Sequence, residues 1–405
     1  MNVLMISPGF PQEMRFFTRG LAEVGAKVVG IGDQPESAVP EPARSALAAY
    51  VQVRSFTDES DVLAKVREIA RRVSLERVEC LWEPYMILAA RIRGMLGLPG
   101  LTVEQTVPFR DKEVMKRVLD AAGIRTPHHY SATTTTQVRE SVERIGYPVI
   151  LKPIAGAGSA DTYRVESDQD LERVLPKLAR VPEVSVEEFV VGEDMTYETL
   201  CVNGNIALES VAIYEPRALV MRENEWISPT TFVFRDPEAA EFDAGREMGH
   251  RVIEALGFQT GYTHMEWYRT PSGEAVFGEI GGRPPGARLV DLINYAFDID
   301  TYRGWAEAVV HGRFTQPVER KYNAAWIFKR ARGQGVIQRY EGLEYILAEF
   351  GPWICRLELN PIGSPRRDWK NVLVGDGMVI IRHPDRETAI RMRNHVQAHL
   401  HIVAG

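Results

Sequence analysis

The sequence predicts an α/β protein with additional α+β parts, and three observations lead to this fold class. Short apolar stretches alternate with amphipathic ones over the first hundred residues, as in a parallel sheet with crossover helices. Later stretches pair strands more locally, including a hairpin around Thr270–Gly273. At 405 residues with 45% hydrophobic content, the chain is long enough for two or three cores.

The amino-terminal region reads as a βαβ opening. A strand over Asn2 to Ser7, a helix over Met14 to Val24 and a strand over Lys27 to Gly32 begin a parallel domain that ends near residue 105. The loop SPGFPQ lacks the G-x-G-x-x-G pattern, so support for a dinucleotide site is weak. Glu83 follows a later strand, where a surface position is favoured over contact with a ligand at the sheet edge.

A helix is predicted from Arg110-Asp111-Lys112, with Asp111 as its cap and Gly123 as its end. Lys112 then lies in the first turn, where a cation opposes the helix dipole. This position suggests that the lysine serves another purpose, although a solvated lysine is an equal alternative.

The next region reads as a compact α+β unit with a glycine-rich loop, LKPIAGAGSADTY. Its predicted helices are Gln137 to Ile145 and Asp168 to Ala179, and its strands are Tyr147 to Lys152, Asp161 to Val165 and Ser185 to Val190. Gly156 and Gly158 would let backbone amides face a phosphate, and Lys152 precedes the loop. A plain flexible turn is the alternative, because the loop lacks the P-loop pattern.

Two glutamates are predicted to face each other in the hairpin. If Ser272 and Gly273 are the central turn residues, counting outward places Glu266 directly opposite Glu279, on one face. Opposed carboxylates repel unless a cation lies between them, and Mg²⁺ prefers oxygen ligands of this kind. The pair therefore suggests a metal site, with two solvated glutamates as the alternative.

The rest of the chain surrounds this hairpin. Asp236-Pro237 is expected to begin a long helix through Leu256, and Thr301 to His311 forms another. After the hairpin, Arg283 and then Arg288 follow in irregular backbone, where a guanidinium suits phosphate or carboxylate. From about Gly312 the composition changes, and the expected elements form a small α+β domain without an evident catalytic group: strands at 323–330, 357, 372–375 and 378–382, and a helix at 387–400.

Composition excludes several functional classes. The net charge of −7, without a basic tract, gives no basis for binding nucleic acid or an anionic membrane. The first residues show no basic n-region followed by a long apolar stretch, and no run of about 18 apolar residues occurs, so we expect a protein that is neither secreted nor membrane-spanning. Cys80, Cys201 and Cys355 are odd in number and lack metal-binding spacing, so they are expected to be reduced thiols of a cytoplasmic protein.

Four stretches together resemble the ATP-grasp superfamily over residues 1 to about 310: DKEVMKRVLDAAGIRTP, YPVILKPIAGAGS, VEEFVVGEDMTYE, and HMEW followed by GEIGGRPPG. Gly261 and His264 beside Glu266, and the domain from about Ala324, are most similar to carboxylate–amine ligases, which include L-amino-acid ligases and carnosine synthase. The resemblance implies a three-part ATP-grasp architecture, with a Rossmann-like domain at 1–105, an ATP-grasp domain at 106–312 that contains a lid at 126–190, and a carboxy-terminal domain at 313–405.

The resemblance also implies site residues, here for ATP and one or two Mg²⁺ ions. Arg283, Lys152 and His264 are the expected catalytic residues; Arg283 stabilises an acyl phosphate, and His264 contacts substrate unless its role is packing. The expected nucleotide contacts are Lys112, Lys152, Gly156, Gly158, Ser159, Glu187, Glu188, Phe189, Val190 and Asp194. Asp194 is the expected ribose residue, with Glu193 as a competitor, and Glu266 and Glu279 are the expected Mg²⁺ ligands. Gly281 stands where the family commonly has asparagine, which leaves the second metal in doubt.

The implied reaction joins a carboxylate to an amine through an acyl phosphate, with release of ADP and phosphate. Two alternatives stay open: a related carboxylase or ligase that uses bicarbonate or a nucleotide-precursor acid, and a protein that senses ATP without catalysis. The substrates are expected to be amino acids, but their identity is not predicted. Residues that could recognise them, or could simply pack, are Tyr214, Arg217, Arg222, Trp226 and Tyr262. Oligomeric state is also open, a homodimer being one alternative.

Overall fold

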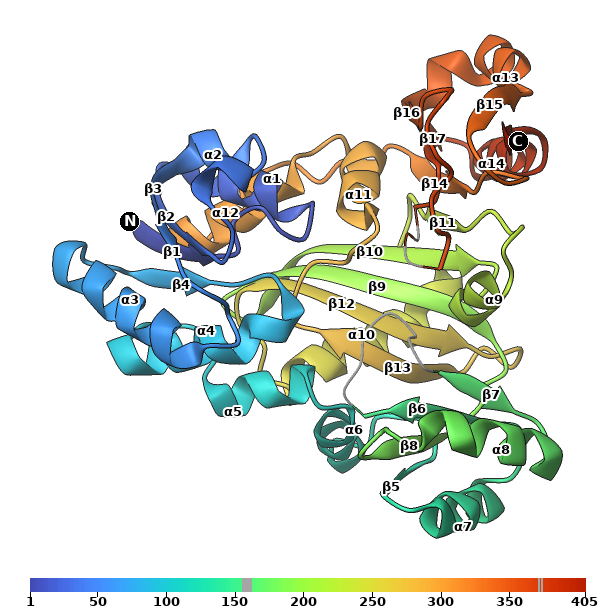
Figure 1. Ribbon diagram of the computed structural model, residues 1–405, viewed down its shortest axis with the longest axis horizontal. Coiled ribbons are helices and arrows are strands. Elements are labelled where there is room, and N and C mark those ends of the chain that lie inside the picture. The colour runs from blue at the N-terminus through green and yellow to red at the C-terminus, as the bar shows by residue number, and fades with distance from the viewer. Residues whose placement is uncertain (155–161, 371, 373) are drawn as a thin grey trace.

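The computed structural model describes residues 1–154, 162–370, 372 and 374–405. Within them the strands form four sheets, and helices pack on and between these sheets (Figure 1). One sheet is parallel and belongs to the amino-terminal region, and the others are antiparallel. The predicted α/β class with α+β parts is therefore confirmed.

The amino-terminal sheet has the parallel strand order β3-β2-β1-β4. Its strands are β1 (Asn2–Ile6), β2 (Lys27–Gly32), β3 (Leu47–Gln52) and β4 (Arg77–Glu79). The helices of this region are α1 (Met14–Glu23), α2 (Ala43–Ala46), α3 (Glu59–Arg72), α4 (Met86–Leu96) and α5 (Val103–Thr106). Strand β4 is short, and after it the chain turns through a 3-10 helix at Glu83–Tyr85.

A small antiparallel sheet follows, in the order β5-β8-β6-β7. Helix α6 (Lys112–Ala121) leads into it. Its strands are β5 (His129–Ala132), β6 (Val149–Pro153), β7 (Tyr163–Val165) and β8 (Val184–Glu188), and its helices are α7 (Thr135–Ile145) and α8 (Asp168–Val174). Apolar residues of α7, α8 and the strands share one core, so this unit is a single layer of helices on a sheet.

The largest sheet has eight strands in the order β13-β12-β9-β10-β11-β14-β17-β16. They are β9 (Glu193–Val202), β10 (Asn205–Glu215), β11 (Thr230–Val233), β12 (Gly261–Arg269), β13 (Ala275–Gly281), β14 (Asn323–Lys329), β16 (Ile354–Leu359) and β17 (Gly377–His383). Because β11 pairs with β14, this sheet continues past residue 312 into the carboxy-terminal region. The domain limits given above stay predictions.

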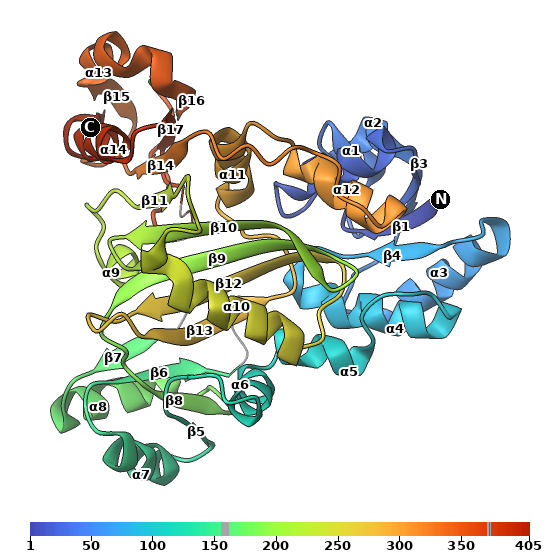
Figure 2. The ribbon, with the colours of Figure 1, turned by 180° about the vertical axis from the view of Figure 1, so that it is seen from behind.

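Helices cover both faces of the large sheet, and α10 (Asp243–Ala255) crosses one of them (Figure 2). Gly245 and Gly249 allow this approach, since a Cβ at either position would meet the ring of Trp267 or Tyr197 at 2.2–2.4 Å. On the other face, α11 (Leu289–Phe297) and α12 (Thr301–His311) share a core with α1, which joins the amino-terminal region to the sheet.

The carboxy-terminal region adds a two-stranded sheet of β15 (Ile337–Glu341) and β18 (His401–Ala404), with helices α13 (Leu343–Phe350) and α14 (Arg386–His399). A short helix, α9 (Ala218–Glu223), precedes β11. Across the described residues, every helix is too short or too polar to cross a membrane.

The predicted helix start at Asp236-Pro237 is wrong. The Asp236 carboxylate accepts a hydrogen bond from the backbone N–H of Glu238 at 3.0 Å, which closes a local turn. A short 3-10 helix then brings Phe242 into the core, and α10 begins only at Asp243. The strand expected at 372–375 is also not formed by its described residues.

Candidate active site

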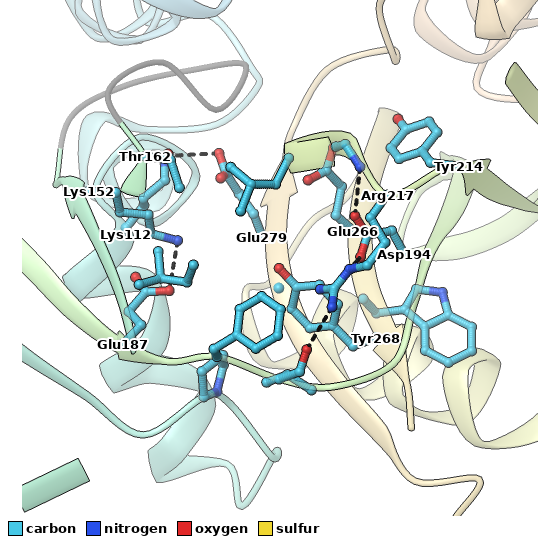
Figure 3. A pocket seen from close by; sticks show the side chains of 18 of the residues that line it. Lys112, Lys152, Thr162, Glu187, Asp194, Tyr214, Arg217, Glu266, Tyr268 and Glu279 are labelled. Carbon is cyan, nitrogen blue, oxygen red and sulfur yellow. Dashed lines mark hydrogen bonds and ion pairs between the residues drawn. The ribbon is translucent and has the colours of Figure 1, made fainter. Parts of the chain in front are cut away.

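A pocket lies where the small sheet faces the end of the large one (Figure 3). Strands β6 and β8 line one side, and strands β9, β10, β12 and β13 line the other. Nine predicted site residues border it: Lys112, Lys152, Glu187, Glu188, Phe189, Val190, Asp194, Glu266 and Glu279. His264 and Arg283 also border it, so the predicted site residues that the structure describes share one pocket.

Glu266 on β12 lies opposite Glu279 on β13, as the sequence predicts. The local register differs from the predicted one, however. Arg269 pairs with Ala275 rather than with Val276, so five residues rather than the expected six lie between these paired positions, and a bulge at Gly278 restores the pairing of the two glutamates. A Cβ at Gly278 would lie 2.8 Å from the backbone oxygen of Glu266, so glycine suits this bulge.

Cationic groups contact both carboxylates. Lys112 Nζ lies 3.1 Å from Glu279 Oε1, and His264 Nε2 lies 3.5 Å from Glu266 Oε1. Burial alone would raise the pKa of Glu266, but His264, followed by Arg283 and Lys152, outweighs it and lowers that pKa. The Glu266 side chain is surrounded by protein but is 47% exposed, because it borders the open pocket. An ionised carboxylate is thus accessible to a ligand.

Lys112 occupies the first turn of α6, as predicted. The Asp111 side chain caps that helix by accepting from the backbone N–H groups of Glu113 and Val114, both at 3.0 Å. The cap fixes the direction of the helix, and Lys112 is buried against the pocket rather than solvated. The solvated alternative is therefore wrong.

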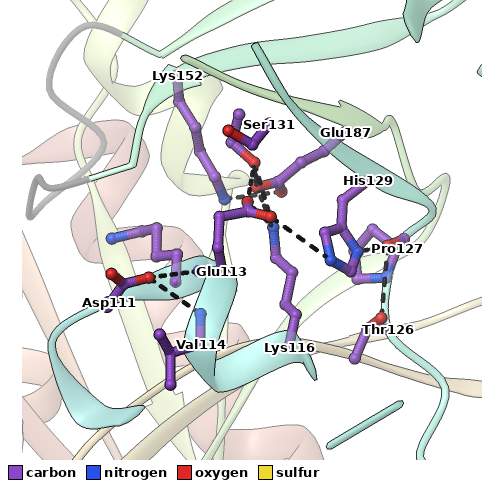
Figure 4. A network of polar contacts seen from close by, with 12 residues as sticks. Asp111, Glu113, Val114, Lys116, Thr126, Pro127, His129, Ser131, Lys152 and Glu187 are labelled. Carbon is purple, nitrogen blue, oxygen red and sulfur yellow. Dashed lines mark hydrogen bonds and ion pairs between the residues drawn. The ribbon is translucent and has the colours of Figure 1, made fainter. Parts of the chain in front are cut away.

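Glu187 lies between two lysines (Figure 4). Its Oε2 lies 2.8 Å from Lys152 Nζ, and its Oε1 pairs with Lys116, which is buried under the pocket. Burial by itself would raise the pKa of Glu187, but Lys152 and then Lys116 outweigh it and hold that pKa well below its usual range. The sequence predicted a nucleotide contact at Glu187 but not these ion pairs of its carboxylate, and Lys116 was missed because helical spacing does not reveal burial.

The same balance acts on Lys152. Burial alone would lower its pKa, but the attraction of Glu187 and then of Glu279 raises that pKa above its usual range. Lys152 is therefore charged at neutral pH. Together with Lys112 and Arg283, it places positive charge around the pocket that contains the two opposed glutamates.

Phe189 and Val190 line the far end of the pocket. Phe189 lies between two guanidinium groups, with Arg164 at 4.1 Å and Arg217 at 4.8 Å from its ring centre. The backbone oxygen of Val190 accepts from Arg217 at 3.1 Å. Glu188 contributes a carboxylate that pairs with Arg125 at 2.9 Å.

Asp194 and its neighbour Glu193 face different surroundings. Asp194 lines the pocket and accepts from Arg217 Nε at 2.6 Å and from the backbone N–H of Ala218 at 3.0 Å. Glu193 pairs instead with Arg269 at 2.7 Å. Successive residues of a strand point to opposite faces, which explains why only Asp194 reaches the pocket.

His264 forms a buried contact that sequence reasoning missed. Its Nδ1 lies 2.9 Å from Glu198 Oε1, on the neighbouring strand β9, where the two residues are direct partners. Burial lowers the pKa of His264, but hydrogen bonds to Glu198 and Glu266 outweigh it and raise that pKa to about 9. The sequence did contain a signal for this contact: Glu198 is a glutamate inside the apolar stretch MTYETLCV, and a buried glutamate usually has a partner.

Arg283 is held by the amino-terminal domain. Its Nε lies 2.7 Å from Glu83 Oε2, while Glu83 Oε1 pairs with Arg110. Glu83 is buried, so the surface position favoured from the sequence is wrong. Gly281 adjoins the same arginine, because a Cβ there would lie 3.3 Å from Arg283 Cγ.

The remaining candidates divide into two groups. Tyr214 and Arg217 line the pocket, whereas Tyr262 is buried in the core beside Phe17 and Trp226 is exposed beneath Arg366. Arg222 is also exposed on α9. The predicted phosphate loop, with Gly156, Gly158 and Ser159, lies outside the described residues.

The carboxylate oxygens of Glu266 and Glu279 are suitable ligands for a hard divalent cation such as Mg²⁺. Glu266 and Glu279 offer two accessible carboxylates, and Mg²⁺ commonly takes one or two carboxylates and completes its shell with phosphate oxygens and water. Among the described residues, no three metal-binding side chains converge, so the protein supplies part of a shell rather than a closed cage. The two glutamates would hold the ion beside the phosphates.

The fold and pocket define a protein in which two antiparallel sheets enclose lysines, carboxylates and an arginine. Residues 109–214 match the ATP-grasp domain family, which confirms the superfamily resemblance. The chain is 23% identical over 313 residues to the L-arginine-specific L-amino acid ligase of Bacillus subtilis, covering 75% of this chain and 73% of that protein. It is 26% identical to the alanine–anticapsin ligase of Bacillus amyloliquefaciens, covering 60% of this chain and 55% of that protein.

A solved structure agrees with the fold. The L-amino acid ligase from Bacillus licheniformis superposes with a TM-score of 0.78 at 19% identity, covering 100% of this chain and 98% of that one. At this identity the likeness establishes the fold alone. The similarity to amino-acid ligases, inferred above from the residues, is confirmed by the two sequence relatives.

Proposed function

We propose that this protein is an ATP-dependent ligase that joins the carboxylate of one small molecule to the amine of another, most simply two amino acids. The opposed pair Glu266 and Glu279, in one pocket with Lys112, Lys152 and Arg283, is the observation that carries the proposal. The names of the relatives, an arginine-specific amino acid ligase and an alanine–anticapsin ligase, support the same chemistry.

In this reaction the acid attacks the γ-phosphate of ATP and displaces ADP, which gives an acyl phosphate. Phosphoryl transfer asks the protein mainly to align the reactants and neutralise charge. Lys112 and Lys152 would bind phosphate oxygens, and Arg283 would stabilise the acyl phosphate. Bound Mg²⁺ would supply further charge neutralisation at the two glutamates. The amine then displaces phosphate, leaving an amide.

The other end of the pocket supports binding of a nucleoside. Phe189 offers an aromatic face and Val190 a backbone oxygen that already accepts from Arg217. Asp194, rather than Glu193, is our proposed ribose residue, because its carboxylate borders the pocket. We also propose a cytoplasmic location, which agrees with three free cysteines.

Two alternatives make different predictions. A ligase that uses bicarbonate or a nucleotide-precursor acid would release ADP only when such an acid is present. A sensor would bind ATP and form no ADP. Gly281 is the sequence feature that favours the sensor, but a Cβ there would lie 3.3 Å from Arg283 Cγ, so the glycine leaves room for the arginine side chain.

The deciding experiment incubates the protein with ATP, Mg²⁺ and pools of amino acids and other small acids. Phosphate release and new product masses are recorded together. ADP formation that needs both an acid and an amine, with a product lighter by one water than their sum, supports the proposal. ATP binding without turnover under every combination contradicts it, and dependence on bicarbonate favours the first alternative.

A further inference from the structure

Two loops of the amino-terminal domain follow the carboxyl ends of neighbouring strands in its parallel sheet. Strands β1 and β4 are neighbours, and the chain leaves β1 toward β2 on one side while β4 lies on the other. Ligands of open α/β sheets bind outside the carboxyl ends of the strands where the strand order reverses in this way. The loops that follow β1 and β4 therefore occupy the position where such a sheet binds small molecules.

Aromatic side chains from both loops gather there. The Phe10 ring lies 4.6 Å from that of Trp82, and Trp82 lies 4.7 Å from Tyr85. Tyr85 packs in turn on the buried Phe56, with 4.8 Å between ring centres. Phe10 is 57% exposed although it belongs to this cluster. A large apolar side chain exposed beside other aromatic rings is typical of a contact surface.

The loop that carries Phe10 is held in one conformation. Ser7 adopts φ +56°, an unusual value for a residue with a side chain, and its hydroxyl donates to the backbone oxygen of Phe10 at 2.7 Å. Gly9 packs so closely on Pro40 that a Cβ would lie 2.4 Å from the proline ring. Strained backbone that is locked by its surroundings often marks a binding site.

The aromatic cluster is linked to the pocket through Glu83 and Arg283. Glu83 lies in the chain between Trp82 and Tyr85, and its carboxylate holds Arg283, which lines the pocket. The backbone beside Arg283 also touches the amino-terminal domain, since a Cβ at Gly282 would lie 3.3 Å from the Met86 side chain. A substrate whose carboxylate reaches Arg283 would thus have its other end near the aromatic rings.

We propose that Phe10, Trp82 and Tyr85 form a subsite for an apolar side chain, aliphatic or aromatic, of one amino-acid substrate. This inference rests on the proposed ligase function and specifies the class of substrate. The rings supply an apolar surface, on which a charged side chain would lose hydration that an apolar side chain does not have to give up. A substrate with a large apolar side chain would bind better than glycine, because its side chain buries apolar area on the rings.

The test compares Phe10→Ala with Tyr345→Ala, a matched control that is 56% exposed on α13, far along the chain in the carboxy-terminal region. Each of the twenty L-amino acids is supplied in both roles with ATP and Mg²⁺, and kcat/KM is taken from ADP release. We expect leucine and phenylalanine to exceed glycine in the wild-type protein. Phe10→Ala should reduce this preference about tenfold, whereas Tyr345→Ala should leave it unchanged.

A binding measurement separates this inference from the ligase function. If no amino acid supports ADP release, the ligase proposal fails, and L-leucine or L-phenylalanine is then titrated calorimetrically into protein that holds Mg²⁺ and a non-hydrolysable ATP analogue. Binding that Phe10→Ala weakens and Tyr345→Ala does not would support the subsite. The subsite is overturned by wild-type preference for charged or small side chains, by preference that Phe10→Ala leaves intact, or by no binding of either amino acid.

Discussion

Glu266 of β12 lies directly opposite Glu279 of β13, and this relationship results from two irregularities that offset each other. The connection between the paired Arg269 and Ala275 is one residue shorter than the pairing of Glu266 with Glu279 requires, and the bulge at Gly278 adds that residue on β13. Each change alone would turn one carboxylate to the opposite face of the sheet. The facing carboxylates thus depend on the bulge.

Replacing Gly278 with alanine should therefore disturb both stability and activity. The added Cβ would lie 2.8 Å from the Glu266 backbone oxygen, so the bulge must shift. We expect a lower melting temperature and a weaker dependence of ADP release on Mg²⁺. Gly94→Ala in helix α4 is the control, because the added Cβ would meet no other group within 4 Å, and this variant should melt at or slightly above the wild-type temperature.

Glu279→Ala should reduce ADP release about a hundredfold or more, the scale seen when one charge-stabilising group is removed from an active site. The expected cause is the loss of one of two carboxylates for Mg²⁺. Glu274→Ala on the same hairpin is the control, since that exposed glutamate lies outside the pocket. Normal turnover by Glu279→Ala would refute the metal assignment. The same scale of loss is expected for Lys152→Ala and Arg283→Ala.

Glu83→Gln should reduce ADP release about tenfold, because Arg283 keeps a hydrogen-bond partner but loses the charge that orients it. Glu59→Gln is a matched control in the same domain: its carboxylate pairs with Arg91 at the surface, where such pairs contribute little. Circular dichroism should show both variants folded. Equal activities in the two variants would contradict a role for Glu83 in holding Arg283.

How far the sequence predicted this site depends on the kind of signal. Local patterns succeeded: Asp111 caps α6 and so places Lys112, and the turn residues near Ser272 located the hairpin. The register came out right although the turn length was wrong, because no periodicity shows a bulge. Side-chain environments were harder to predict, since Glu83 and Glu198 are buried beside residues that lie far away in the chain, Arg283 and His264.

Glu187 predicts a pH dependence of stability. Its pKa is depressed in the folded protein by Lys152 and Lys116, so its contribution to stability is complete above the unfolded pKa, about 4.3, and is lost as the pH falls toward the folded value. Between about pH 6 and about pH 3.5, the wild-type urea midpoint should therefore fall more steeply than that of Glu187→Gln. Parallel curves would contradict the depressed pKa.

Asp194 and Glu193 can be separated as ribose residues with 2′-deoxy-ATP. If the Asp194 carboxylate accepts a hydrogen bond from the ribose, the wild-type protein should use ATP better than the deoxynucleotide, since a site built for a hydroxyl rejects an analogue without one. Asp194→Asn should raise the KM for ATP about tenfold and reduce this preference, because a charged acceptor forms the stronger hydrogen bond. Glu193→Gln should change neither quantity, as its carboxylate pairs with Arg269 instead. If Glu193→Gln loses the preference and Asp194→Asn keeps it, the ribose contact belongs to Glu193. Strand β9 would then have to turn the Glu193 side chain toward the pocket when the nucleotide binds.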